Sequence, residues 1–138
     1  MSDQQRLRVL LVDDEPHDLE QLERIVKFVA KDAEVVATAA SGDEALAVSA
    51  PFDVAIVDYR MPQMNGIELA EQLKRDHPDC TVVIITAFED AREEILEHPA
   101  VDHYHEKALI YEVEPLLEKI AAERRGEGKK RRGLLRRK

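Results

Sequence analysis

Short apolar runs alternate along the chain with segments in which apolar residues recur every three or four positions. A short apolar run that ends at a polar residue predicts a buried strand. Apolar residues at every third or fourth position predict a helix with one apolar face. Strands are predicted at residues 8–12, 35–39, 52–57 and 81–85 and, from a weaker pattern, at 101–106. Helices are predicted at residues 19–29, 41–50, 67–77, 91–97 and 110–122.

The alternation of strand and helix predicts the fold class. Five strand and helix pairs in succession are typical of an α/β protein. The strand runs are continuously apolar rather than apolar at every second position, which indicates a sheet covered on both faces. We therefore expect one doubly wound parallel sheet with helices on both faces. The sequence contains no internal repeat and no sign of a second domain.

Length and composition agree with a single α/β domain. The chain has 138 residues, of which 44% are hydrophobic but only 4% aromatic, so the core must consist of aliphatic side chains. Cys80 is the only cysteine, which excludes an internal disulfide and fits a reducing compartment. No apolar stretch is long enough for a membrane span or a signal peptide. These features predict a soluble, cytoplasmic protein.

Charge is distributed unevenly along the chain. The net charge is −9, yet residues 124–138 contain nine Lys or Arg and one acid, Glu127, which makes this segment +8 and the remainder −17. We therefore predict a domain over residues 1–122 and a basic tail over 123–138. Such a segment is most often disordered and solvated. The alternative is that it binds an anionic partner such as nucleic acid, an acidic lipid surface or an acidic protein.

Polar residues that can carry chemistry follow four of the predicted strands. They are Asp13 and Asp14 after the first strand, Asp58 after the third, Thr86 after the fourth and Lys107 after the fifth. In a parallel α/β sheet the carboxyl ends of the strands form the ligand-binding edge. Clustered carboxylates repel one another, and Mg²⁺, which prefers oxygen ligands, would relieve that repulsion. An aspartate can also form an aspartyl phosphate.

Each of these residues alone has an ordinary structural explanation. Acids before Pro16 favour a helix N-terminus, and Asp58 could belong to a turn. Thr86 could cap a helix, and Lys107 could be a solvated surface residue. The functional interpretation is favoured because all of these explanations would have to coincide at one edge.

The motif at residues 58–66, Asp-Tyr-Arg-Met-Pro-Gln-Met-Asn-Gly, closely resembles the phosphoacceptor loop of response-regulator receiver domains. The acidic pair at 13–14 stands at the expected distance before it, and residues 41–46 resemble the second helix of that family. The resemblance covers about residues 6–122. It implies a flavodoxin-like, five-stranded sheet of order 2-1-3-4-5.

The resemblance also implies a metal site and a phosphorylation site. It makes Asp58 the phosphorylated residue and makes Asp14 and Asp58 direct ligands of Mg²⁺. Asp13 would act largely through water, and the backbone carbonyl of Arg60 would complete the protein's share of the ligands.

Three further roles follow from the resemblance. Thr86 would bond one phosphoryl oxygen, and Lys107 would pair with another. Tyr104 occupies the position of the family's aromatic switch. One departure concerns Ala108, because the family usually has proline there in a cis peptide. A non-proline cis bond costs about 2.5–4 kcal/mol. The resemblance thus implies either a strained cis bond or a trans loop that alters the reach of Lys107.

The function implied is that of a phospho-accepting switch rather than an enzyme with a separate substrate. Its partners would be a histidine kinase or phosphotransfer protein and an unknown downstream target. Three rivals remain open at this point: a flavin-binding or other phosphate-cradling enzyme, a small-molecule phosphatase with an aspartate nucleophile, and a degenerate receiver used only for binding. The acids of the first loop disfavour the first rival because they would repel a phosphate.

Two further features of the sequence give weaker signals. His103 and His105 alternate on the weak strand, which suggests a metal pair, but no third ligand is evident and a surface pair is the favoured interpretation. Arg60 and Phe88 lie two positions after Asp58 and Thr86. In the receiver family these positions border the path of the attacking water. We hypothesise that they slow the loss of a phosphoryl group.

Overall fold

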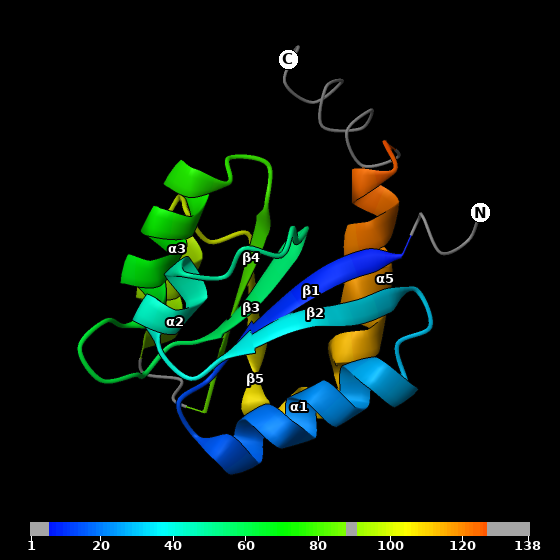
Figure 1. Ribbon diagram of the computed structural model, residues 1–138, viewed down its shortest axis with the longest axis horizontal. Coiled ribbons are helices and arrows are strands. Elements are labelled where there is room, and N and C mark those ends of the chain that lie inside the picture. Colours follow the sequence, from blue (N-terminus) through cyan, green and yellow to red (C-terminus); the bar gives the residue numbers. More distant parts are fainter. Residues whose placement is uncertain (1–5, 88–90, 127–138) are drawn as a thin grey trace.

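The fold is a five-stranded, all-parallel sheet of order β2-β1-β3-β4-β5, as predicted (Figure 1). The structure is a computed structural model that describes residues 6–87 and 91–126. The strands are β1 (Leu7–Val12), β2 (Ala33–Ala39), β3 (Val54–Asp58), β4 (Thr81–Thr86) and β5 (His103–Glu106). The helices are α1 (Pro16–Phe28), α2 (Gly42–Leu46), α3 (Gly66–Asp76), α4 (Arg92–Glu97), the 3₁₀ segment η3 (Lys107–Glu112) and α5 (Val113–Arg124).

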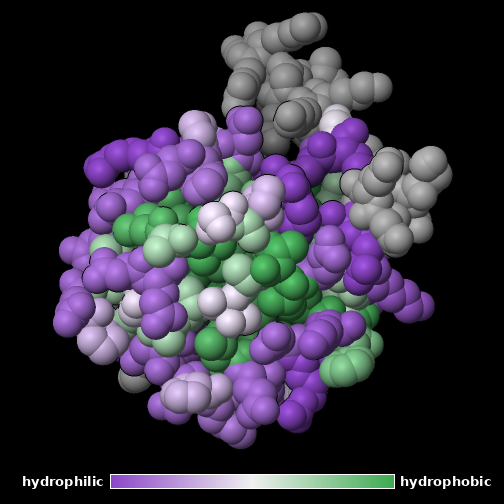
Figure 2. All heavy atoms as spheres, viewed as in Figure 1, coloured by the Kyte–Doolittle hydropathy of each residue, from purple (hydrophilic) through white to green (hydrophobic). Residues whose placement is uncertain are grey.

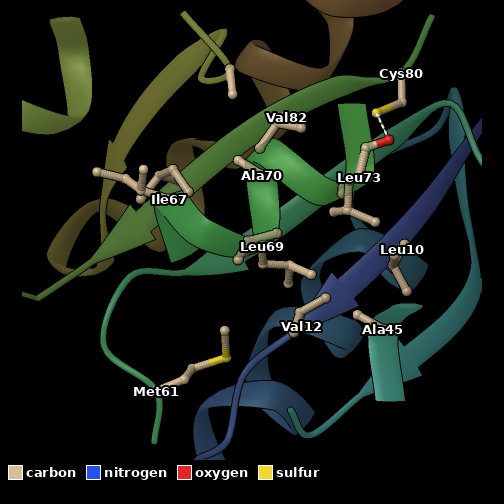
Figure 3. Close-up of a cluster of buried hydrophobic side chains, with 14 of the residues drawn as sticks. Leu10, Val12, Ala45, Met61, Ile67, Leu69, Ala70, Leu73, Cys80 and Val82 are labelled. Atoms are coloured by element: carbon tan, nitrogen blue, oxygen red, sulfur yellow. Dashed lines mark hydrogen bonds between the residues drawn. The ribbon is translucent and has the colours of Figure 1, made fainter. Parts of the chain in front are cut away.

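Helices cover both faces of the sheet, and each face has its own hydrophobic core. On one face α1 and α5 pack through residues such as Leu22, Ile25 and Leu117. On the other face α2, α3 and α4 pack through residues such as Ala45 and Leu69. Figure 3 shows the second cluster, in which side chains of α3 lie against β1 and β4. Burial on both faces explains why the inner strands β1, β3 and β4 are almost continuously apolar.

The strand register aligns the carboxyl ends that carry the chemistry. Val12, the last residue of β1, pairs with Val57 of β3, and Asp58 pairs with Ile85 of β4. At the far side of the sheet, Thr86 pairs with Glu106, the residue before Lys107. The three inner strands and β5 therefore end at one edge.

Two predicted helices differ from those observed. The helix expected over 41–50 begins as predicted, where the Ser41 side chain accepts a hydrogen bond from the Glu44 backbone N–H, but α2 ends at Leu46. A tighter turn follows the helix, in which the backbone N–H of Val48 donates a hydrogen bond to the carbonyl of Ala45, three residues earlier. The helix expected over 110–122 is divided into η3 and α5. Proline fits only the first turn of an α-helix, and Pro115 stands in the first turn of α5, which therefore begins at Val113.

The surface is largely polar. Figure 2 shows charged and polar residues over most of one face, with hydrophobic residues gathered near the middle, where the edge strand β2 lies in Figure 1. Within residues 6–87 and 91–126, no helix is long and apolar enough to cross a membrane. Most of the basic tail, residues 127–138, lies outside the described residues.

Candidate functional site

The first acidic residues of the site lie where β1 turns into α1. Asp13 is buried, with 1% of its surface exposed, whereas Asp14 is exposed. The Asp13 Oδ1 atom accepts a hydrogen bond of 2.9 Å from the backbone N–H of Glu15. This local bond fixes the Asp13 carboxylate at the carboxyl edge of the sheet.

Asp58 ends β3, and the loop after it is held closely against the start of α3. The backbone N–H of Gly66 donates to the carbonyl of Tyr59 over 2.8 Å. Asn65 and Glu68 form a reciprocal capping box at the helix N-terminus. A side chain at Gly66 would bring its Cβ within 2.7 Å of the backbone oxygen of Asp58, so this position requires glycine. The Asn-Gly pair of the sequence motif thus sets the place of Asp58.

Asp13, Asp14 and Asp58 come together as the sequence predicts. One carboxylate oxygen of each lies within 4.8 Å of the others. Burial, and next the negative charge of Asp13, raise the pKa of Asp58 to about 6, although Lys107 opposes the rise. Burial also raises the pKa of Asp13, against the hydrogen bonds from Lys107 and from the Glu15 backbone. Three crowded carboxylates of this kind fit a divalent cation with oxygen ligands.

Lys107 reaches this cluster from the end of β5. Its Nζ atom lies 2.9 Å from Asp13 Oδ2, 2.9 Å from Asp18 Oδ2 and 3.3 Å from Asp58 Oδ1. Burial alone would lower the pKa of Lys107, but the hydrogen bonds to Asp13 and Asp18 raise it well above its usual value. The Lys107–Ala108 peptide bond is trans, so of the two alternatives for this loop the trans one is observed. The lysine nevertheless reaches Asp58.

The two predicted switch residues lie on the neighbouring strands β4 and β5. Thr86 ends β4 and is buried, with 1% exposure. Tyr104 is half-buried on β5 and packs against the core formed with α2, α3 and α4. The guanidinium of Arg92 in α4 lies 5.6 Å from the centre of the Tyr104 ring, within the range of a cation–π contact. Helix α4 therefore contacts the aromatic ring of the residue that the family resemblance assigns as the switch.

The weaker sequence signals concern two histidines on β5 and two residues near the predicted phosphorylation site. The His105 ring nitrogen Nε2 lies 2.7 Å from the Leu109 carbonyl, and His103 Nε2 lies 3.8 Å from Glu123, so both histidines have contacts other than with each other. Among the described residues, the group of His, Cys, Asp and Glu side chains close enough to share an ion is the aspartate cluster. Arg60 is exposed, and Phe88 lies outside the described residues.

Sequence reasoning missed Asp18. It lies in the first turn of α1, and its contact with Lys107 joins positions 89 residues apart. The only sequence signal for it is a carboxylate one helical turn after Asp14, near the same edge of the sheet. That signal says nothing about which distant side chain the carboxylate meets.

The fold and the site define an α/β protein with an acidic cluster and a lysine at the carboxyl edge of its sheet. The model of the response regulator receiver domain matches residues 9–109. The chain therefore belongs to the response-regulator receiver family, whose members are regulatory parts of two-component signalling systems.

Individual relatives agree with this membership. Response regulator GacA of Pseudomonas viridiflava is 39% identical over 88 residues, which cover 61% of this chain and 40% of that protein. A cyclic di-GMP phosphodiesterase of Thermotoga maritima is 33% identical over 84 residues, 61% of this chain and 22% of that protein. The chain thus spans less than half of these relatives.

A solved structure of similar fold contains a metal. The crystal structure of response regulator TrrA from Thermotoga maritima, in complex with Mg²⁺-BeF, superposes with a TM-score of 0.69 at 32% identity. The similarity covers 83% of this chain and 96% of that one.

Proposed function

We propose that the protein is a phospho-accepting response regulator that takes a phosphoryl group onto Asp58 in a Mg²⁺-dependent reaction. The observation that carries this proposal is the meeting of three carboxylates within 4.8 Å of one another with a lysine Nζ 3.3 Å from Asp58. A carboxylate at such a place can act as a nucleophile, and the lysine can pair with an oxygen of the incoming group.

The residues that would hold Mg²⁺ are Asp13, Asp14 and Asp58, together with the backbone carbonyl of Arg60. The donor set fits because it consists of hard oxygen atoms, and burial together with the negative charge of Asp13 already raises the pKa of Asp58. The ion, when bound, neutralises charge on the acids and on the phosphoryl oxygens. The TrrA relative, solved with Mg²⁺-BeF, supports the same choice of metal.

In the proposed reaction, an Asp58 carboxylate oxygen attacks the phosphorus of a phosphohistidine on a histidine kinase or phosphotransfer protein. The phosphorus–nitrogen bond breaks, its electron pair returns to the imidazole, and an acyl phosphate forms on Asp58. Lys107 and Thr86 would hold phosphoryl oxygens. Tyr104 would respond to the movement of Thr86 and so change a surface that binds a downstream protein.

We further propose that the domain catalyses only its own phosphorylation and dephosphorylation. The same features disfavour the rival functions, because a flavin or free phosphate would meet Asp13 and Asp14 at the first loop. A degenerate receiver is disfavoured because the acids, Thr86 and Lys107 are all present. We assign residues 1–122 to the receiver domain, 123–138 to the tail, and the protein to the cytoplasm, where a single cysteine stays reduced.

Intact mass spectrometry tests the proposal. The purified protein is treated with acetyl phosphate, once with Mg²⁺ and once with a chelator. We expect the mass of one added phosphoryl group with Mg²⁺ only, and no addition to Asp58→Asn under either condition. A modified Asp58→Asn protein, or a wild type that stays unmodified, would contradict the proposed function.

A further inference from the structure

The three contacts of the Lys107 ammonium are not equivalent. An ammonium has three N–H donors, so it can serve one carboxylate with each. The two shorter contacts, both 2.9 Å, go to Asp13 and Asp18, and the 3.3 Å contact goes to Asp58. The two shorter bonds therefore fix the direction of the third donor, which faces the carboxylate that would react.

Asp18 stands on a firmer support than the segment that carries Lys107. Helix α1 is fixed to the sheet by the buried side chains of Leu22, Ile25 and Val26. Lys107 instead opens the η3 segment, in which Ala108 and Leu109 are exposed and the backbone of Leu109 is not helical. The contact with Asp18 thus ties the lysine of a partly exposed segment to a helix that packs on the sheet.

The lysine also has room to move away from Asp58. A cavity of about 40 Å³ lies beside it, lined by Asp13, Asp18, Gln21, Leu22, Ile85 and Ile110. A long side chain next to free space has several rotamers available, and a fixed partner reduces their number. Asp18 is the carboxylate that supplies such a partner from the α1 side.

We propose that Asp18 is a positioning residue: it holds the Lys107 ammonium at the place from which it meets a phosphoryl oxygen on Asp58. This inference rests on the proposed function and adds to it a residue on α1 that does not touch the reacting atoms.

The test measures the rate of Asp58 phosphorylation by acetyl phosphate at saturating Mg²⁺. We expect Asp18→Ala to react roughly tenfold more slowly, since small errors of placement are costly in group transfer. Asp18→Glu, which keeps the carboxylate, should recover most of the rate. Glu20→Ala is the matched control, because it removes an exposed acid from the same helix whose salt-bridge contact is with Arg24. It should react like the wild type.

A double-mutant cycle separates positioning from a general structural effect. In a Lys107→Ala background, Asp18→Ala should slow the reaction no further, because the group that it positions is gone. The rise in melting temperature with Mg²⁺ should persist in Asp18→Ala. An equal or faster rate in Asp18→Ala, or an equal slowing in both backgrounds, would overturn the inference and leave the proposed function intact. A wild type that takes no phosphoryl group would overturn both.

Discussion

At the scale of single residues, the site brings together negative charges that the fold alone does not neutralise. Asp13 and Asp58 are buried, Asp14 is adjacent, and Lys107 supplies one positive charge. Burial raises the pKa of Asp58 to about 6 because the ionised form loses water and faces Asp13. The folded protein without metal therefore holds an unfavourable charge at neutral pH.

Replacing Asp58 should consequently stabilise the protein when no divalent ion is present. The pKa of Asp58 is higher in the folded state than its usual 3.8, so the folded state binds the proton more tightly and stability falls as pH rises from about 4 to about 6. Asp58→Asn should raise the free energy of unfolding at pH 7.5 by about 1–3 kcal/mol. Denaturant unfolding in a chelating buffer measures the difference.

The difference should shrink at pH 4, where Asp58 is protonated in the folded state and about half protonated in the unfolded state. The control is Asp32→Asn, an exposed acid between α1 and β2, which should change stability by less than about 0.5 kcal/mol at either pH. A wild type as stable as Asp58→Asn at pH 7.5 would mean that the buried carboxylate carries no such penalty.

At the scale of elements, the loop that follows Asp58 depends on the close approach of α3 to β3. A Cβ at Gly66 would lie 2.7 Å from the Asp58 carbonyl oxygen, which is rigid backbone. A Cβ at Gly42 would instead meet the sulfur of Met64, the end of a flexible side chain, at 2.5 Å. The two glycines thus differ in what must move to admit a methyl group.

We expect Gly66→Ala to lower the free energy of unfolding by about 1–3 kcal/mol and to slow Asp58 phosphorylation, because the backbone of the loop must shift. Gly42→Ala should cost less, since Met64 can adopt another rotamer. Denaturant unfolding and the acetyl phosphate assay give the two readouts. Equal effects of both substitutions would show that the contact with Asp58 is not what requires glycine at residue 66.

A second element, α5, is fixed to the amino end of the sheet by Asp53. Arg8 donates to both Asp53 carboxylate oxygens, at 2.9 and 3.1 Å, and Arg124 lies 3.5 Å away while also bonding to the carbonyl of Asp79. Burial alone would raise the pKa of Asp53, but the hydrogen bonds from Arg8 outweigh it and keep the pKa below its usual value.

Loss of this anchor should be measurable by its dependence on pH. Asp53→Asn should lower the free energy of unfolding by about 1–2 kcal/mol at pH 7, because two arginines lose a charged acceptor. Since the folded pKa is depressed, this contribution is present above the unfolded value near 4 and is lost as pH falls through the folded value. Glu34→Gln, which breaks the exposed contact with Arg6 at 3.9 Å, should have almost no effect.

The elements also show what the sequence could and could not predict. Four apolar runs predicted β1 to β4, whereas β5 followed from a weaker pattern, because its four residues are polar or aromatic and only half-buried. The end of α2 and the division between η3 and α5 were not predicted, since they depend on turn hydrogen bonds and on where Pro115 falls within a helical turn. The contact of Asp18 with Lys107 depends on tertiary geometry that local patterns do not carry.

At the scale of the whole molecule, metal binding and folding should be linked. An ion that binds only the folded state stabilises it by about 2.7 kcal/mol at a hundred times its dissociation constant. We expect the melting temperature to rise with millimolar Mg²⁺, and Asp14→Asn to remove most of that rise. Asp14 is a suitable change because it is exposed and leaves the buried residues of the cluster in place. A melting temperature indifferent to Mg²⁺ would mean that the cluster binds no metal.

At the same scale, the charge of the molecule is distributed unevenly between the body and the tail. Residues 124–138 carry +8 on a body of −17, and their bases are separated by glycines with no apolar face beyond Leu134 and Leu135. If this segment binds nucleic acid, the affinity should fall steeply with salt, with a log–log slope of roughly −5 for about six neutralised phosphates. Fluorescence anisotropy with a labelled DNA duplex at several salt concentrations measures that slope.

The structure decides where the tail should be cut. Arg124 ends α5 and bonds to Thr81 and to the carbonyl of Asp79, so a deletion that includes it would also damage the fold. A chain truncated after Gly126 keeps these contacts and loses seven of the nine bases. This variant should accept a phosphoryl group at the wild-type rate and lose its affinity for the duplex. An unchanged affinity for the duplex would exclude the tail as the binding segment. A wild type that binds anionic vesicles but not DNA would indicate that the anionic partner of the tail is a lipid surface.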